Sequence, residues 1–126
     1  MSQGVLDTSV VIALAHGEPV ALPAEASAVS IVTLCELHLG VLVADDVRRP
    51  ARLATLVMAE NEFDALTVDA RVVPHYARMM SAARREGRRP TTNDVLIAAT
   101  AAAHRLPVYT RDRDFVGLDG VEVVLA

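Results

Sequence analysis

The sequence contains no lysine, and all twelve of its lysine or arginine positions are arginines. A chain without lysine cannot be a P-loop nucleotide-binding protein, cannot form a Schiff base, and lacks the lysine of receiver and phosphatase folds. The positive charge that balances its carboxylates must therefore come from arginine, histidine or a metal ion. Arginine by itself also suits phosphate groups, because its guanidinium is always charged and can bind two oxygens at once.

Cysteine and long apolar runs are also scarce. The single cysteine, Cys35, excludes an internal disulfide and favours a reducing compartment. No stretch approaches the length of a membrane span, and the first residues lack the positively charged segment of a signal peptide. We therefore expect a cytoplasmic protein that has no contact with membranes.

The composition indicates one α/β domain. A chain of 126 residues is long enough to bury a core, and its 52% hydrophobic residues are mostly alanine, valine and leucine. This mixture favours helices packed on a small sheet. The net charge of −4 argues against a protein that coats nucleic acid without specificity, although it permits local basic patches.

Short apolar strands alternate with apolar helices along the chain, which predicts a parallel sheet. The expected strands lie at 5–6, 28–31, 63–68, 106–109 and 121–124, and the expected helices at 10–14, 32–43, 51–60, 72–83 and 95–104. The third helix should bury Leu53, Leu56 and Val57. Asp69 should cap the fourth helix, Gly87 should end it, and Thr91 or Thr92 should cap the fifth.

Four acidic residues share a predicted position. Asp7 and Asp112 follow strands at their carboxyl ends, whereas Glu36 and Asp94 lie near the starts of apolar helices and face inward. In a parallel sheet these positions meet at one edge. Carboxylates crowded together repel one another, so a hard divalent cation such as Mg²⁺ or Mn²⁺ is the expected remedy.

Three of these acids also have an ordinary interpretation. Asp7 could cap the first helix, Asp94 could stabilise a helix dipole, and Glu36 could be exposed. A zinc site is disfavoured, because the histidines show no ligand-like spacing with Cys35. The four histidines are more simply interpreted as structural or exposed residues: His16, His38, His75 and His104.

Four blocks of sequence carry a specific resemblance. They are Val5–Ser9, Ser30–Leu37 with Gly40, Asn93–Ala101, and Thr110–Phe115. Together they resemble the signature blocks of PIN-domain ribonucleases, and most of all the VapC-type toxins of bacterial toxin–antitoxin pairs. The resemblance runs in order along the whole chain, so it implies a single PIN-like nuclease domain over residues 1–126.

The resemblance implies an Mg²⁺-dependent endoribonuclease, in which Mn²⁺ could substitute, with a five-stranded parallel sheet between helices. It assigns Asp7, Glu36 and Asp94 to the metal site, and Asp112 matches the fourth acid best, although Asp114 stays open. Supporting polar groups would be Thr8 or Ser9, Asn93 and Thr110. The partners implied are RNA, a small antitoxin and a second copy of the chain in a homodimer.

Arginines flank this predicted site in the sequence and are candidates for binding RNA phosphates. They are Arg84, Arg85, Arg88, Arg89, Arg111 and Arg113. The first four could instead form a solvated basic turn at the end of a helix. With no tryptophan, two phenylalanines and two tyrosines, few rings can stack on bases, so RNA shape and a few polar contacts should set selectivity.

Three other functions compete with a ribonuclease. A phosphoacceptor receiver would share the α/β sheet, but the lack of lysine opposes it. A degenerate PIN-like module that only binds RNA or protein would have lost acids that are present here. A structure-specific DNA nuclease uses similar metal chemistry, but the small size disfavours it.

Overall fold

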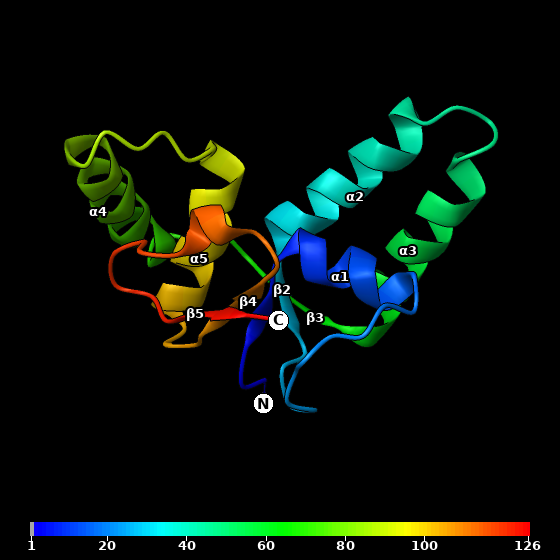
Figure 1. The fold of residues 1–126 in the computed structure, drawn as a ribbon, viewed down its shortest axis with the longest axis horizontal. Helices are drawn as coiled ribbons and strands as arrows, with labels where there is room; N and C mark the ends of the chain where they lie inside the picture. The colour runs from blue at the N-terminus through cyan, green and yellow to red at the C-terminus, as the bar shows by residue number, and fades with distance from the viewer. Residues whose placement is uncertain (1) are drawn as a thin grey trace.

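The computed structural model describes residues 2–126, which form five strands, five α-helices and one 3₁₀ turn (Figure 1). The strands are β1 (Val5–Leu6), β2 (Ala28–Ser30), β3 (Asp64–Leu66), β4 (Val108–Thr110) and β5 (Val123–Leu125). The helices are α1 (Thr8–Ala15), α2 (Ile31–Val43), α3 (Arg49–Glu62), α4 (Val72–Arg85) and α5 (Thr92–Ala103), with the 3₁₀ turn η1 at Arg113–Phe115.

All the strand pairs are parallel, and the order across the sheet is β3-β2-β1-β4-β5. The predicted α/β class and parallel five-stranded sheet are confirmed. The first strand is central, so its two residues, Val5 and Leu6, are completely buried. Parallel strands covered on both faces need such continuous apolar sequence.

Helices cover the two faces of the sheet and form two cores. Helices α4 and α5 lie on one side in Figure 1, and α1, α2 and α3 lie on the other. Val5 packs in the first core with Met79 and Ile97, whereas its neighbour Leu6 packs in the second with Val10 and Leu56. The alternation of side chains along a strand sends successive residues to opposite faces.

The carboxyl ends of the strands lie at one edge of the sheet, where several helices begin. Asp7 directly follows β1 and precedes α1, and Ser30 ends β2 and caps α2 by accepting a hydrogen bond from the Val32 N–H. Thr110 ends β4 at the same edge. This edge therefore collects the polar residues that the strand–turn–helix pattern predicted.

Several predicted helix ends are confirmed, and one cap is wrong. Thr91 caps α5 by accepting a hydrogen bond from the Asp94 N–H, and Gly87 follows α4 with a φ of +75°. Asp69 lies too early to cap α4, whose N-cap is Arg71. Its carboxylate accepts hydrogen bonds from the backbone and guanidinium of Arg71, chiefly the latter, which lowers the pKa of Asp69.

The predicted buried face of α3 is also wrong in part. Leu56 is buried, but Leu53 and Val57 are exposed, and Thr55 and Ala59 turn inward instead. The helix packs against α1 and α2 through this small-residue face. Strand β1 is observed as predicted, whereas the other four predicted strands are one to three residues longer than the observed ones. Ile31 already begins α2, and the outer residues of the predicted third strand lie outside the ladder. Strands β4 and β5 also end one residue later than predicted.

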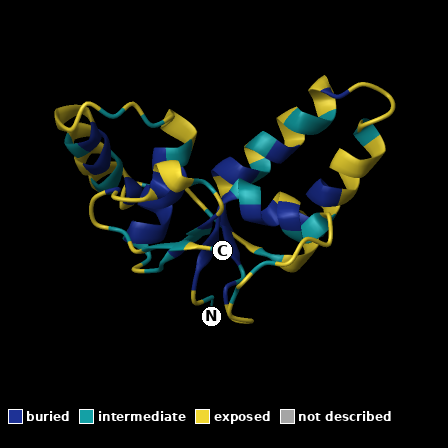
Figure 2. Ribbon diagram, viewed as in Figure 1, coloured by how far each residue is buried: buried dark blue, intermediate teal, exposed yellow. Residues whose placement is uncertain are grey.

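The α2–α3 hairpin extends beyond the sheet and carries an exposed apolar tip (Figure 2). Its large exposed side chains are Leu39, Leu42, Val43 and Val47. Apolar residues gathered on a surface in this way are typical of a contact with another molecule. Within residues 2–126, no helix combines the length and apolar character that crossing a membrane requires.

Candidate active site

Asp7 is buried at the end of β1, with only 4% of its surface exposed. Its Oδ2 accepts hydrogen bonds from Ser9 Oγ at 2.7 Å and Thr110 Oγ1 at 2.8 Å. Asp7 occupies the N-cap position of α1, but its side chain accepts no backbone N–H there. The interpretation of Asp7 as a capping side chain is therefore wrong, and the carboxylate is held by two hydroxyls instead.

Glu36 lies on α2, half-buried, facing the start of α1. Its Oε1 accepts a hydrogen bond from Thr8 Oγ1 at 2.6 Å, and its Oε2 lies 3.5 Å from the donor Nδ2 of Asn93. Within residues 2–126 no arginine or histidine forms an ion pair with Glu36. Its negative charge is therefore stabilised by neutral groups alone, and the residue is not the freely exposed glutamate of the ordinary interpretation.

Asp94 lies in the first turn of α5 and interacts electrostatically with three other acidic residues. Its pKa is raised from 3.8 to about 6, first by burial and next by the negative charge of Asp7. Asp112 and Glu36 raise it further, and a hydrogen bond with Thr91 opposes the shift. Asp7, Glu36 and Asp112 therefore all lie within reach of Asp94, as the topology predicted, and the four residues are named here the acidic cluster.

Of Asp112 and Asp114, Asp112 is the one that connects to the other acids. Asp112 contributes to the raised pKa of Asp94, while Asp114 does not. The Asp112 N–H donates to Thr110 Oγ1 at 2.9 Å, so the same hydroxyl connects Asp112 to Asp7. Asp112 Oδ1 also accepts the backbone N–H of the exposed Asp114 at 2.9 Å.

The acidic cluster suits a hard divalent cation by its chemistry. All its donors are oxygens, and the negative charges of Asp7, Asp112 and Glu36 add to burial in raising the pKa of Asp94. In the described part of the chain, no three Asp, Glu, His or Cys side chains are close enough to enclose a metal ion alone. Mg²⁺ fits such an open arrangement, because it keeps several waters and needs only one or two carboxylates.

Of the six arginines predicted to bind RNA, some donate side-chain hydrogen bonds within the described part of the protein and others do not. Arg111 is held by Glu18 at 2.6 Å and by the Pro19 carbonyl, and Arg88 donates to the Asp114 carbonyl at 2.7 Å. Arg85 donates to Ser81 Oγ. Three are exposed and make no side-chain hydrogen bond or ion pair within residues 2–126: Arg84, Arg89 and Arg113.

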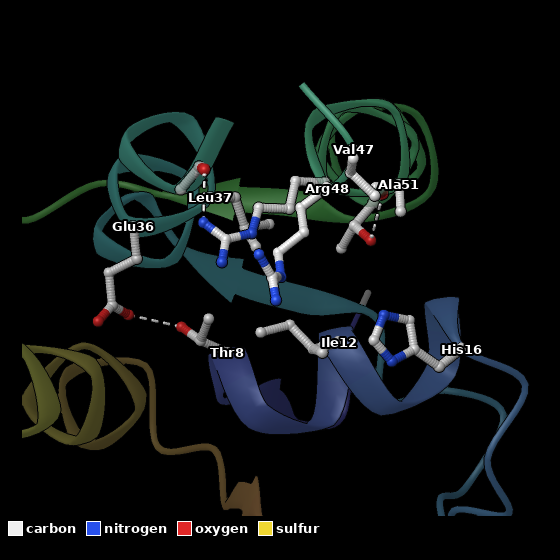
Figure 3. A pocket seen from close by; sticks show the side chains of 11 residues that line it. Thr8, Ile12, His16, Glu36, Leu37, Val47, Arg48 and Ala51 are labelled. Atoms are coloured by element: carbon white, nitrogen blue, oxygen red, sulfur yellow. Dashed lines mark hydrogen bonds between the residues drawn. The ribbon is translucent and has the colours of Figure 1, made fainter. Parts of the chain in front are cut away.

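A groove that sequence reasoning missed lies between α1, α2 and α3 (Figure 3). Its volume is about 670 Å³, and it adjoins the acidic cluster because Glu36 and Thr8 line one end. The remaining lining is largely apolar, with two arginines from the α2–α3 hairpin: Ile12, His16, Leu37, Gly40, Val47, Arg48, Ala51, Arg52 and Thr55. The sequence signal that could have indicated this groove is the set of valines and leucines near 40–47, which are too many for one buried helix face.

The family model of the PIN domain matches residues 4–121, a range that contains all four sequence blocks. The chain belongs to the PIN-domain family. This PIN domain is 44% identical over 125 residues to Ribonuclease VapC5 of Mycobacterium tuberculosis, covering 96% of this chain and 91% of that protein. It is 38% identical over 96 residues to Ribonuclease VapC4 of the same organism, covering 76% and 74%.

Solved structures agree with this membership. A crystal structure of VapBC-5, from the VapBC family of toxin–antitoxin systems of Mycobacterium tuberculosis, matches with a TM-score of 0.77, 41% identity and 98% of each chain covered. DNA-bound VapBC from Salmonella typhimurium matches with a TM-score of 0.83 over 98% of each chain, and at 23% identity it shows the fold alone. PIN-domain ribonucleases generally depend on a divalent metal ion.

Proposed function

We propose that this chain is a metal-dependent endoribonuclease and the toxin of a type II toxin–antitoxin pair. The observation that carries the proposal is the convergence of four carboxylates at the carboxyl edge of the sheet, where Asp94 feels the charges of Asp7, Asp112 and Glu36. Identity to VapC ribonucleases over nearly the whole chain supports the activity. Retention of all four acids favours a working nuclease over a degenerate binding module, and the ribonuclease relatives favour RNA over DNA as the substrate.

We assign the metal-binding role to Asp7, Glu36, Asp94 and Asp112, with Mg²⁺ as the ion and Mn²⁺ as its substitute. A bound divalent ion supplies positive charge at the scissile phosphate and makes water a better nucleophile at neutral pH. The protein contributes rigid oxygens: Ser9 and Thr110 hold Asp7, and Thr8 holds Glu36. Preorganised charges of this kind need no rearrangement during the reaction.

The free arginines are the best candidates to hold RNA. Arg84, Arg89 and Arg113 have unengaged guanidinium groups, and Arg89 also borders a hollow of about 210 Å³ beside Arg88 and Asp114. Guanidinium groups bind phosphate oxygens in pairs, which positions a strand without reading its sequence. Arg111 and Arg88 are engaged elsewhere and are weaker candidates.

The groove between α1, α2 and α3 is the surface we assign to the antitoxin. A partner with apolar side chains and an acidic group would match its lining and the guanidiniums of Arg48 and Arg52. Because Glu36 and Thr8 line the same groove, its occupant would cover part of the acidic cluster. We further propose a single domain over residues 1–126, a homodimer and a cytoplasmic location.

Cleavage of RNA by purified protein tests the proposed activity. Asp7→Asn, Glu36→Gln and Asp94→Asn should each lower the rate with Mg²⁺ or Mn²⁺ by about 100-fold or more, since each removes a charge that the ion needs. The exposed acids Glu62 and Asp119 give matched controls, and Glu62→Gln and Asp119→Asn should cleave like the wild type. Full activity in Glu36→Gln would show that this site assignment is wrong.

A further inference from the structure

Thr33 is a completely buried threonine on α2 whose hydroxyl does not follow the usual pattern of this chain. Two other buried threonines donate to the carbonyl four residues earlier, Thr55 to Ala51 and Thr100 to Leu96. Within residues 2–126, the only side-chain hydrogen bond of Thr33 is with Thr8 Oγ1, at 3.0 Å. A buried hydroxyl needs a hydrogen-bond partner, and for Thr33 that partner is the Thr8 hydroxyl on α1.

Thr8 connects Thr33 to the acidic cluster. Its Oγ1 is 3.0 Å from Thr33 Oγ1 and 2.6 Å from Glu36 Oε1. A threonine hydroxyl has a single proton, and an ionised carboxylate can only accept. The contact geometry has the Thr8 hydroxyl as the donor to both oxygens, and its single proton goes to the closer, charged Glu36 Oε1. A hydroxyl proton rotates to suit its surroundings, so the proton of Thr33 then turns to Thr8 Oγ1, which makes a continuous chain from Thr33 to Glu36.

We propose that Thr33 is a positioning residue for Glu36, acting through Thr8; this rests on the proposed role of Glu36 in divalent-ion binding. Thr33 lies one helical turn before Glu36 on α2, so the two side chains share a face. The chain fixes Oε1 toward α1 and leaves Oε2, whose partner Asn93 is 3.5 Å away, as the more available oxygen. Hydrogen bonds to ligating carboxylates orient them in this way.

The inference differs from a simple packing role for Thr33. Valine has nearly the shape of threonine but lacks its hydroxyl, so a side chain that only fills space could be replaced by valine with no effect on Glu36. If the hydroxyl orients Glu36, valine should keep the fold but loosen the carboxylate. Serine keeps the hydroxyl and should rescue the effect.

Calorimetric titration with Mn²⁺ alone, on protein without RNA, measures the predicted effect. We expect Thr33→Val to weaken Mn²⁺ binding about fivefold or more and to lower kcat with KM little changed. Thr33→Ser should lie within about twofold of the wild type in both measurements. Thr100→Val is the matched control, since it removes another fully buried hydroxyl, and its Mn²⁺ affinity should be unchanged.

A double-mutant cycle tests the route through Thr8. If Thr33 acts only through Thr8, the Thr8→Val/Thr33→Val protein should bind Mn²⁺ no more weakly than Thr8→Val alone. Wild-type Mn²⁺ affinity in Thr33→Val, or additive losses in the cycle, would overturn the proposal. If Thr33→Val does not fold, Thr33→Ser and Thr33→Ala give the same comparison. A wild-type protein that neither binds Mn²⁺ nor cleaves RNA would instead overturn the proposed function.

Discussion

At the scale of single residues, the neighbours of Asp94 determine its properties. The residue occupies the first turn of a helix, where a negative charge normally gains from the helix dipole. Burial and the charge of Asp7 outweigh that gain and raise its pKa to about 6. The metal-free protein therefore carries an electrostatic strain that the unfolded chain does not.

This strain predicts how the stability of metal-free protein depends on pH. The folded-state pKa of Asp94 lies above its ordinary value of 3.8, so the folded protein binds more protons between these two pH values. Its stabilising effect is present below pH 3.8 and is lost as the pH rises through about 6. Because Asp94 is partly exposed, we expect a loss of roughly 1 kcal/mol after solvent screening.

Urea unfolding with chelator at pH values from 4 to 7 checks this prediction. Asp94→Asn should lose less stability than the wild type across the window, whereas the exposed control Asp119→Asn should follow the wild type. Parallel curves for wild type and Asp94→Asn would mean that Asp94 titrates normally.

At the scale of structural elements, the α2–α3 hairpin joins the proposed active site to a surface for partners. Glu36 and Leu37 lie near the middle of α2 and line the groove, while Leu42 and Val43 near its end are exposed. Large apolar side chains exposed together in this way mark a site of contact with another molecule. The same element therefore contributes to the proposed ion site and to the proposed antitoxin surface.

A charge placed on this hairpin should separate the two functions. Val47 lines the groove and is 88% exposed, so Val47→Glu should not disturb folding or RNA cleavage. It should weaken capture of the co-expressed cognate antitoxin, because a desolvated charge in an apolar interface is costly. Growth arrest by Val47→Glu should then persist when the antitoxin is present.

The matched control for this experiment is Val73→Glu on α4, which also places a charge at an exposed valine but on the other side of the sheet. Its growth arrest should be relieved by the antitoxin as in the wild type. Equal relief for both variants would move the antitoxin surface away from the groove.

The sequence predicted the helices and strands, and the positions of the acidic residues, wherever these follow from the local pattern of apolar and polar residues. Asp7 was placed correctly because an apolar strand, a polar turn and an apolar helix determine where a strand ends. The buried face of α3 was missed, because only the position of α1 and α2 decides whether Leu53 or Thr55 turns inward. The partners of Arg111 and Thr33 were missed because Glu18 and Thr8 are distant in sequence and meet only in the folded chain.

At the scale of the whole molecule, the net charge of −4 and the free arginines act at different distances. The overall charge repels RNA from afar, whereas Arg84, Arg89 and Arg113 attract phosphates at close range. Binding should therefore weaken with salt according to the number of phosphates that these arginines bind.

The salt dependence of RNA binding tests this local attraction, using an inactive Asp94→Asn background. Replacing Arg84, Arg89 and Arg113 by alanine should lower the slope of log K against log salt by about 0.7 for each phosphate that the variant no longer binds. Arg105→Ala is the control, because Arg105 follows the opposite end of α5. Identical slopes for the triple variant and Arg105→Ala would leave the three arginines as solvated surface groups.

The order of the strands has a consequence for the timing of synthesis. Strand β1 can pair with β2 soon after both are made. Its other partner, β4, follows about a hundred residues later. The hydrogen bond between Asp7 and Thr110 likewise joins positions 103 residues apart. Such distant pairing is slow to form and cannot begin while the chain is incomplete. A growing chain thus holds Asp7 before it holds Thr110 or Asp112, so the proposed nuclease centre assembles only after residue 112 has been synthesised.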